Sequence, residues 1–162
     1  MPSELINHCG QILKEQGLTI AFAESVTAGR LAAEFSLTEY SGSILKGGLV
    51  CYDAEVKKDV LGISPYLIEE FTPESAEVTK ELANRLKDLI KSDVQVAVTG
   101  LTTPGGSETP QKPVGTIFIH ILIRGGSLAV RDVFEGTPEQ IVLLAADLAA
   151  STITNELKQT TI

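Results

Sequence analysis

The sequence predicts a single α/β domain over residues 1–162, with three α/β/α layers and a mixed, largely parallel sheet that ends in an antiparallel hairpin. Two patterns lead to this prediction. Over the first hundred residues, β-prone runs alternate with amphipathic helical runs, which calls for right-handed crossovers between parallel strands and for helices on both faces of the sheet. Near the C-terminus, two β-prone runs flank Gly125-Gly126, a two-residue connection typical of a β-hairpin.

The first strand and the helices around it are marked by apolar spacing and small residues. Apolar side chains recur at helical spacing over residues 3–16, and Gly17 is placed to end that helix. A β-prone run over residues 19–23 then meets the small residues Thr27-Ala28-Gly29. We therefore expect a strand, a tight turn and a helix that includes Arg30.

A second unit of the same kind follows. Residues 49–52 are expected to end a strand, and Asp53 and Gly62 are expected to cap and close a short helix. A long helix is predicted to begin at Thr72-Pro73-Glu74, with Pro at its first position, and to end near Ser92.

The C-terminal part completes the sheet. An apolar strand over residues 94–99 enters an irregular Gly/Pro/Thr-rich loop over residues 100–115. Strands are expected over residues 116–124 and 127–134, and Thr137-Pro138-Glu139-Gln140 has the pattern of a capping box for a last helix.

Composition excludes several classes of function. The chain has 162 residues, 43% of them hydrophobic, and 13 basic against 21 acidic side chains give a net charge of −8. Nucleic-acid binding needs a basic surface to neutralise phosphates, so no nucleic-acid partner is expected. Cys9 and Cys51 have neither disulfide-framework nor zinc spacing, and no signal peptide or membrane segment is recognised, so we expect a cytoplasmic protein with no membrane partner.

Three segments that could carry chemistry follow three predicted strands, and ligands of such sheets bind beyond the carboxyl ends of the strands. Ser25 stands at a strand-to-helix turn, where free backbone amides could bind a phosphate or an oxyanion. The alternative is that Ser25 only caps the helix. The second segment is Tyr52 with Lys57, where a desolvated lysine could act as the base for a serine hydroxyl. The alternative is a solvated Lys57 on the helix surface.

The third segment is the glycine-rich loop that starts at Gly100. It contains neither a Walker motif nor a dinucleotide-binding motif, so nucleoside triphosphate and dinucleotide cofactors are not expected. His8 lies in the first helix and His120 in the middle of a strand, away from the site where a Ser-His-Asp triad would be assembled. Cys51 alternates with Tyr52 and should be buried.

Taken together, these segments resemble the CinA C-terminal domain family, the nicotinamide-nucleotide amidases, over nearly the whole chain. Residues 23–29 are similar to the family's A-E-S-x-T-[GA]-G, and residues 47–63 to its G-G-x-V-x-Y-x-x-x-x-K-x-x-L-G-V. Thr99-Gly100, Pro104-Gly105-Gly106 and residues 112–116 are similar to S-G-x-x-G-P-x-G-G and K-P-V-G-T. The order and spacing of these motifs make the resemblance specific.

The resemblance implies hydrolysis of nicotinamide mononucleotide to nicotinate mononucleotide and ammonia, with no metal and no cofactor. It implies Ser25 as the nucleophile, Lys57 as its base, and Tyr52 as a proton relay or as a support for the lysine. The expected partner is a small-molecule nucleotide, and a homodimer stays open. The residues expected to bind the substrate are Glu24, Thr27, Ala28, Gly29, Gly100, Gly105 and Gly106.

The chain departs from the family pattern in the predicted pocket. Thr102-Thr103 replaces a small residue and a Gly, and one residue is missing between Pro104 and Gly105. The loop gains residues near Thr109-Pro110-Gln111, and Ala54 stands where the family often has Asn. An alternative function is therefore a catalytically silent module that binds a nucleotide or a partner.

Overall fold

The computed structural model describes residues 1–159, so residues 160–162 of the expected domain lie outside the described part. The strands are β1 (Ile20–Glu24), β2 (Leu45–Val50), β3 (Val94–Gly100), β4 (Thr116–Ile123) and β5 (Gly126–Val133). The helices are α1 (Glu4–Glu15), α2 (Arg30–Ser36), α3 (Ser41–Ile44), α4 (Ala54–Leu61), α5 (Pro65–Phe71), α6 (Ala76–Leu89) and α7 (Pro138–Gln159). None of these helices combines the length and the apolar character that a membrane span requires.

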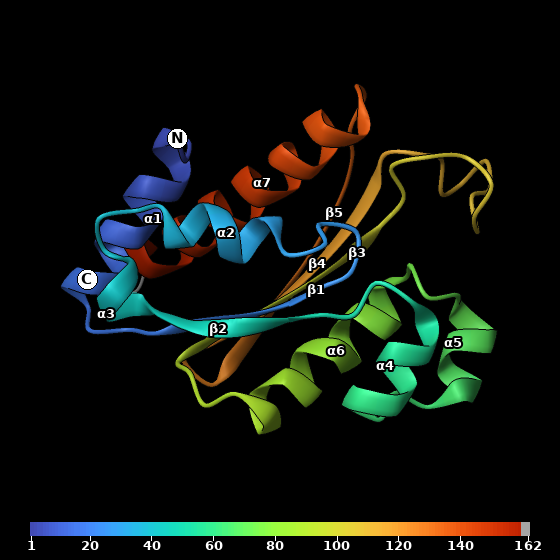
Figure 1. Ribbon diagram of the computed structural model, residues 1–162, viewed down its shortest axis with the longest axis horizontal. Coiled ribbons are helices and arrows are strands. Elements are labelled where there is room, and N and C mark those ends of the chain that lie inside the picture. Colours follow the sequence, from blue (N-terminus) through green and yellow to red (C-terminus); the bar gives the residue numbers. More distant parts are fainter. Residues whose placement is uncertain (160–162) are drawn as a thin grey trace.

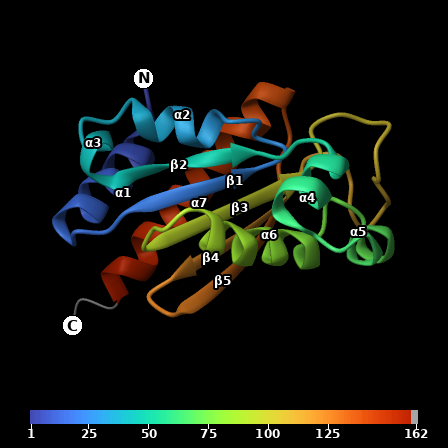
Figure 2. The same ribbon diagram turned by 60° about the horizontal axis from the view of Figure 1, so that its bottom comes forward.

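The strands form one mixed sheet in the order β2-β1-β3-β4-β5. β1 pairs in parallel with β2 and β3, whereas β4 pairs antiparallel with both β3 and β5. Helices α1, α2 and α7 cover one face, and α4, α5 and α6 cover the other (Figure 1). Figure 2, which turns the sheet toward the viewer, shows β5 at one edge and β2 at the other. The predicted three-layer α/β fold is confirmed.

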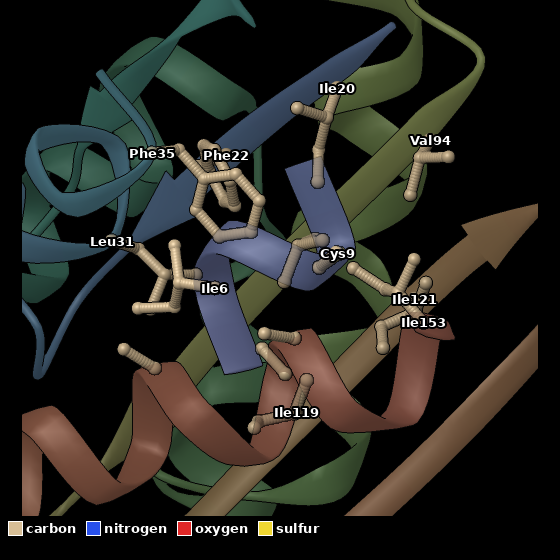
Figure 3. Close-up of a cluster of buried hydrophobic side chains, with 14 of the residues drawn as sticks. Ile6, Cys9, Ile20, Phe22, Leu31, Phe35, Val94, Ile119, Ile121 and Ile153 are labelled. Atoms are coloured by element: carbon tan, nitrogen blue, oxygen red, sulfur yellow. The ribbon is translucent and has the colours of Figure 1, made fainter. Parts of the chain in front are cut away.

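β1 is buried on both faces, because its residues alternate between two apolar clusters. Ile20 and Phe22 pack under α1, α2 and α7, and the Phe22 ring lies 5.1 Å from the Phe35 ring (Figure 3). Ala21 and Ala23 face α6, where their small side chains allow the helix to pack closely. Burying each large apolar side chain contributes roughly 1.5–3 kcal/mol. The end of β1, where Ser25 follows, is therefore held from both sides.

The capping residues predicted from the sequence are confirmed where they act locally. Asp53 accepts a hydrogen bond from the Glu55 amide at 2.7 Å, and Gly62 ends α4 in the left-handed conformation. Thr137 and Gln140 form the reciprocal pair of a capping box. Short-range patterns of this kind are readable because both partners lie within one helical turn.

The predicted start of the long helix is wrong. α6 begins at Ala76, and its N-cap is Ser75, whose hydroxyl accepts a hydrogen bond from the Val78 amide. The preceding segment is held instead by Lys112, whose ammonium donates hydrogen bonds to Thr72 Oγ1 at 2.6 Å and to the Glu74 carbonyl at 2.9 Å. A contact across almost forty residues therefore overrides the local helix signal.

Two further boundaries shift, and two short helices were not predicted. β2 ends at Val50, before Cys51 and Tyr52. The hairpin turn is formed by Arg124 and Gly125, both with positive φ as a type I′ turn requires, so β5 begins at Gly126. α3 and α5 have only 4 and 7 residues, too short for a clear apolar period.

Candidate functional site

The three suspected segments meet in one pocket at the carboxyl ends of the parallel strands, as predicted. The pocket has a volume of about 220 Å³. Its walls contain Ser25, Val26, Tyr52, Glu74 and residues 100–106. The loop over residues 100–115 stands at the same end of the sheet as α4 and α5 (Figures 1 and 2). A cavity of about 340 Å³ includes Asn84, Asp93 and Arg124, but none of the predicted site residues.

Ser25 lies directly beyond β1 and is only 5% exposed. Its backbone is fixed on both sides, since its N–H donates to the Val98 carbonyl at 3.0 Å and its carbonyl accepts from the Ala28 amide at 3.0 Å. Ser25 is not the N-cap of α2, because Gly29 occupies that position. Its hydroxyl is thus available for chemistry, and the alternative of a simple helix cap is not supported.

Lys57 lies in α4 with its side chain buried at 1% exposure, so it is not a solvated surface lysine. Its ammonium donates hydrogen bonds to Ser25 Oγ at 2.9 Å and to the carbonyls of Cys51 at 2.8 Å and Tyr52 at 3.1 Å. Among the described residues, no carboxylate forms an ion pair with it. Burial lowers the pKa of Lys57, and the negative charges of Glu74 and Asp53 oppose this shift.

This arrangement orients the lysine toward the serine in its neutral form. The carbonyls of Cys51 and Tyr52 can only accept hydrogen bonds, so they hold two of the N–H groups. The remaining position on the nitrogen faces Ser25 Oγ. In the neutral amine that position is the lone pair, which can accept the serine proton.

The turn after Ser25 contains polar groups without partners. Among the described residues, no acceptor contacts the backbone amides of Val26 and Thr27. The Thr27 hydroxyl, in a residue that is 2% exposed, also lacks a hydrogen-bond partner in this part of the chain. An amide that directly follows a nucleophile is well placed to bind an oxyanion. Val26 lines the pocket beside Ser25, whereas Thr27 does not.

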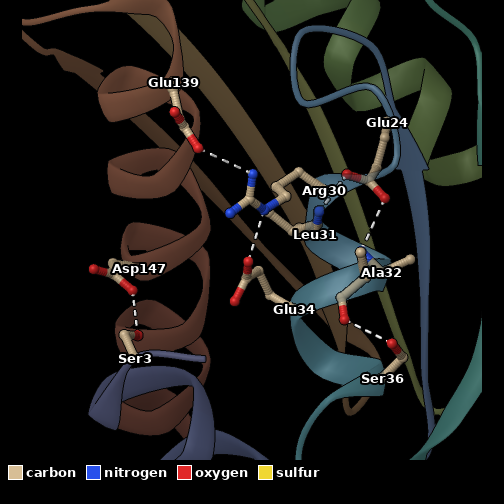
Figure 4. A network of polar contacts seen from close by, with 10 residues as sticks. Ser3, Glu24, Arg30, Leu31, Ala32, Glu34, Ser36, Glu139 and Asp147 are labelled. Atoms are coloured by element: carbon tan, nitrogen blue, oxygen red, sulfur yellow. Dashed lines mark hydrogen bonds and ion pairs between the residues drawn. The ribbon is translucent and has the colours of Figure 1, made fainter. Parts of the chain in front are cut away.

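Glu24 was expected to bind the substrate, but in the structure its side chain caps α2. Its buried carboxylate accepts hydrogen bonds from the amides of Leu31 at 2.7 Å and Ala32 at 3.0 Å (Figure 4). It therefore satisfies two of the free amides in the first turn of α2. The expectation that the helix amides are open to an anion is wrong at these positions, and Glu24 does not line the pocket.

Three small residues expected at the substrate have clear backbone functions. Ala28 and Gly29 have positive φ values of 48° and 95°, which turn the chain from β1 into α2, and neither lines the pocket. Gly100 does line it. A Cβ on Gly100 would lie 2.5 Å from the Thr116 carbonyl oxygen, so Gly is needed for the close pairing of β3 with β4.

Tyr52 and Cys51 both hold Lys57 through their backbone carbonyls, but their side chains differ in exposure. The Tyr52 side chain is 63% exposed and lines the pocket, and it is the backbone carbonyl, not the phenol, that contacts Lys57. Cys51 is fully buried as predicted, and burial raises the pKa of its thiol. A buried neutral thiol is a poor nucleophile.

The rest of the pocket wall comes from the loop. Thr102, Thr103, Gly105 and Gly106 all line the pocket, so the threonine substitutions do fall at the candidate site. Ala54 is not among the lining residues. Within the described residues, no group of three or more His, Cys, Asp and Glu side chains is arranged to hold a metal ion.

The sequence reasoning missed a polar cluster next to the pocket. Ser107 Oγ donates to Glu74 Oε2 at 2.6 Å and accepts from Lys112 Nζ at 2.8 Å. Lys112 thereby ties the loop to the segment before α6. The sequence did contain a signal for this cluster, because Lys112 begins the K-P-V-G-T motif, but no role was assigned to that lysine from the sequence.

Comparison with known proteins identifies relatives over most of the chain. The family model for the CinA C-terminal domain matches residues 2–157. The chain is 34% identical over 149 residues to a CinA-like protein of Thermotoga neapolitana, which covers 92% of this chain and 36% of that protein. It is 37% identical over 131 residues to a CinA-like protein of Petrotoga mobilis, covering 80% of this chain and 32% of that protein. The chain spans about a third of the length of these curated relatives.

Two solved structures have nearly the same fold. The competence damage-inducible protein A of Klebsiella pneumoniae superimposes with a TM-score of 0.91 at 26% identity, over 98% of both chains. A CinA superfamily protein of Escherichia coli gives a TM-score of 0.87 at 27% identity, over 94% of this chain and 88% of that one.

Proposed function

Because the chain belongs to the CinA C-terminal domain family, we propose that it is a serine amidohydrolase that converts nicotinamide mononucleotide into nicotinate mononucleotide and ammonia. The observation that carries this proposal is the contact of 2.9 Å between Lys57 Nζ and Ser25 Oγ, with both residues buried. Burial lowers the pKa of Lys57 and so favours its neutral form, and the hydrogen bonds to two carbonyls orient its nitrogen toward the serine.

The first half of the reaction acylates the serine. Neutral Lys57 takes the proton of the Ser25 hydroxyl as the oxygen attacks the carboxamide carbon. The carbonyl oxygen becomes an oxyanion, which the Val26 amide beside Ser25 can stabilise. Lys57 then gives its proton to the nitrogen, the C–N bond breaks, ammonia leaves, and an ester links the acyl group to Ser25.

The second half releases the acid. A water molecule attacks the ester carbon and gives a proton to Lys57. The same amide again stabilises the oxyanion. When the C–O bond to Ser25 breaks, Lys57 returns the proton to the serine oxygen. The products are nicotinate mononucleotide and the original pair of residues.

The exposed ring of Tyr52 can take part in binding the substrate. It forms a wall of the pocket that contains Ser25. The nicotinamide ring of the nucleotide is planar and positively charged, and such a ring is attracted to the face of a tyrosine. We propose that Tyr52 has two roles: its ring positions the substrate, and its backbone carbonyl orients the Lys57 side chain.

A second candidate function is nucleotide binding without turnover. It is favoured by Thr102 and Thr103, which line the pocket and replace a small residue and a Gly of the family pattern. Binding of the mononucleotide to the wild-type protein without any release of ammonia would support this function over the amidase.

The proposed function is tested by measuring ammonia and nicotinate mononucleotide formed by the purified protein. Ser25→Ala should abolish both products. Ser36→Ala removes an exposed hydroxyl that donates a hydrogen bond to the Ala33 carbonyl in α2, away from the pocket, so this matched control should keep wild-type rates. Full turnover by Ser25→Ala would rule out the proposal.

A further inference from the structure

Two consecutive backbone amides of the pocket loop hold an anion that belongs to the chain itself. Glu108 Oε1 accepts a hydrogen bond from the Gly105 amide at 2.7 Å, and Oε2 accepts one from the Gly106 amide at 2.8 Å. Each carboxylate oxygen thus has its own N–H donor. This bidentate geometry is the one that also suits two oxygens of a phosphate group.

The local backbone favours negative charge at this point. Gly105 has a φ of 98°, in the left-handed region, and successive amides in such a conformation form a concave anion-binding nest. The hydrogen bond from the Gly105 amide is the largest cause that lowers the pKa of the Glu108 carboxyl. The amides of Glu108 and Gly106 and the charge of Lys112 add to this effect.

The same amides belong to the candidate active site. Gly105 and Gly106 line the pocket that contains Ser25, whereas Glu108 is not among the lining residues. Lys112 supplies positive charge nearby, and its ammonium is fixed by hydrogen bonds to neutral oxygens of Thr72, Glu74 and Ser107. The Glu74 carboxylate also lines the pocket, and Ser107 Oγ donates a hydrogen bond to it at 2.6 Å.

We propose that the Gly105 and Gly106 amides form the subsite for the phosphate of the substrate, and that Glu108 is an internal competitor that must leave before the phosphate binds. The identity of the substrate rests on the function proposed above. A partly exposed glutamate on a glycine-rich loop can swing out, and the incoming phosphate dianion carries more charge to the same donors. The amide of Val26 is then left for the oxyanion at Ser25.

Binding measurements test this inference without any need for turnover. In the Ser25→Ala protein, the added change Glu108→Gln should strengthen the affinity for nicotinamide mononucleotide. If Glu108 occupies the amides for ~90% of the time, releasing them improves the affinity about tenfold. Affinity for nicotinamide riboside, which lacks the phosphate, should stay the same, and inorganic phosphate should compete better with the mononucleotide.

The control is Glu70→Gln, which removes an equal charge from an exposed position on α5. It should leave both affinities unchanged, which separates a specific site from general electrostatic repulsion. Glu108→Ala provides a second variant and should act in the same direction. Titration calorimetry gives the dissociation constants.

Each outcome decides the inference. Unchanged or weaker binding of the mononucleotide by both Glu108 variants would overturn it, and so would an equal gain for the riboside. A selective gain for the mononucleotide in the Ser25→Ala background, together with no ammonia release by the wild-type protein, would support the phosphate subsite and refute the amidase. Ammonia release by the wild-type protein together with no selective gain in the Ser25→Ala background would leave the amidase and refute the subsite.

Discussion

Replacement of Lys57 by methionine keeps an unbranched apolar side chain, one atom shorter than that of lysine, but removes the base. General bases contribute about 10²–10⁴ to catalytic rates, so Lys57→Met should lower kcat by that factor, which is about 2.7–5.4 kcal/mol of transition-state stabilisation. The wild-type kcat/KM should rise with pH until Lys57 is deprotonated, below the ordinary lysine pKa because burial lowers it. That limb of the pH profile should be absent in the variant.

The same substitution has a pH-dependent effect on folding. The pKa of Lys57 is lowered in the folded protein, so in the window between that pKa and the ordinary lysine value near 10.4 the unfolded chain binds more protons. Wild-type stability therefore rises with pH in this window, by up to about 1.4 kcal/mol per pH unit, from this one residue. Lys57→Met lacks this gain, although it also leaves the carbonyls of Cys51 and Tyr52 without a donor at every pH.

Urea unfolding at several pH values between 7 and 10 measures the difference in unfolding free energy between the two proteins. Lys58→Met is the matched control, because Lys58 is the next residue in α4 and pairs with Glu55 near the surface. It should keep the wild-type pH profile and kcat. The reasoning would be refuted if the difference between wild type and Lys57→Met did not grow with pH, or if the variant kept its turnover.

Three other changes test the fold around the site. Glu24→Gln removes the charged acceptor of two amides in α2 and should lower the unfolding free energy in urea by about 1.5–3 kcal/mol; a change within error would contradict the capping role. Gly100→Ala places a Cβ 2.5 Å from the Thr116 carbonyl and should cost about 1–3 kcal/mol in the same assay, whereas Gly42→Ala, with open space around its Cβ, should cost far less. Cys51 should resist a thiol reagent in native buffer and react after unfolding, because it is fully buried; rapid native labelling would show an open site.

The main site residues could be predicted because local pattern and topology agree. Ser25 follows a strand, and Lys57 lies one turn into a helix that Asp53 caps. Because β1 and β2 are parallel, both segments leave the sheet at the carboxyl ends of these strands. The Cys51 amide donates to the Glu24 carbonyl at 2.8 Å, which brings the two segments into contact. This contact continues the parallel pairing of β1 with β2 beyond the end of β2.

What the sequence could not reveal is the direction in which side chains turn. Glu24 stands beside Ser25 in the sequence, yet its carboxylate caps α2. Tyr52 supports Lys57 with a carbonyl, which every residue type possesses. The contacts of Lys112 with Thr72 and Glu74 span 40 and 38 positions, so no local rule could place them.

The most direct test of the central claim, that Ser25 forms a covalent acyl intermediate, is partition of that intermediate with hydroxylamine. The protein is incubated with nicotinamide mononucleotide and hydroxylamine, and the hydroxamate and ammonia are both measured. The account predicts that the wild type forms the hydroxamate at the expense of nicotinate mononucleotide, and that Ser25→Ala forms neither. Release of ammonia at the usual rate with no hydroxamate would show that water attacks the amide directly, and would contradict the account.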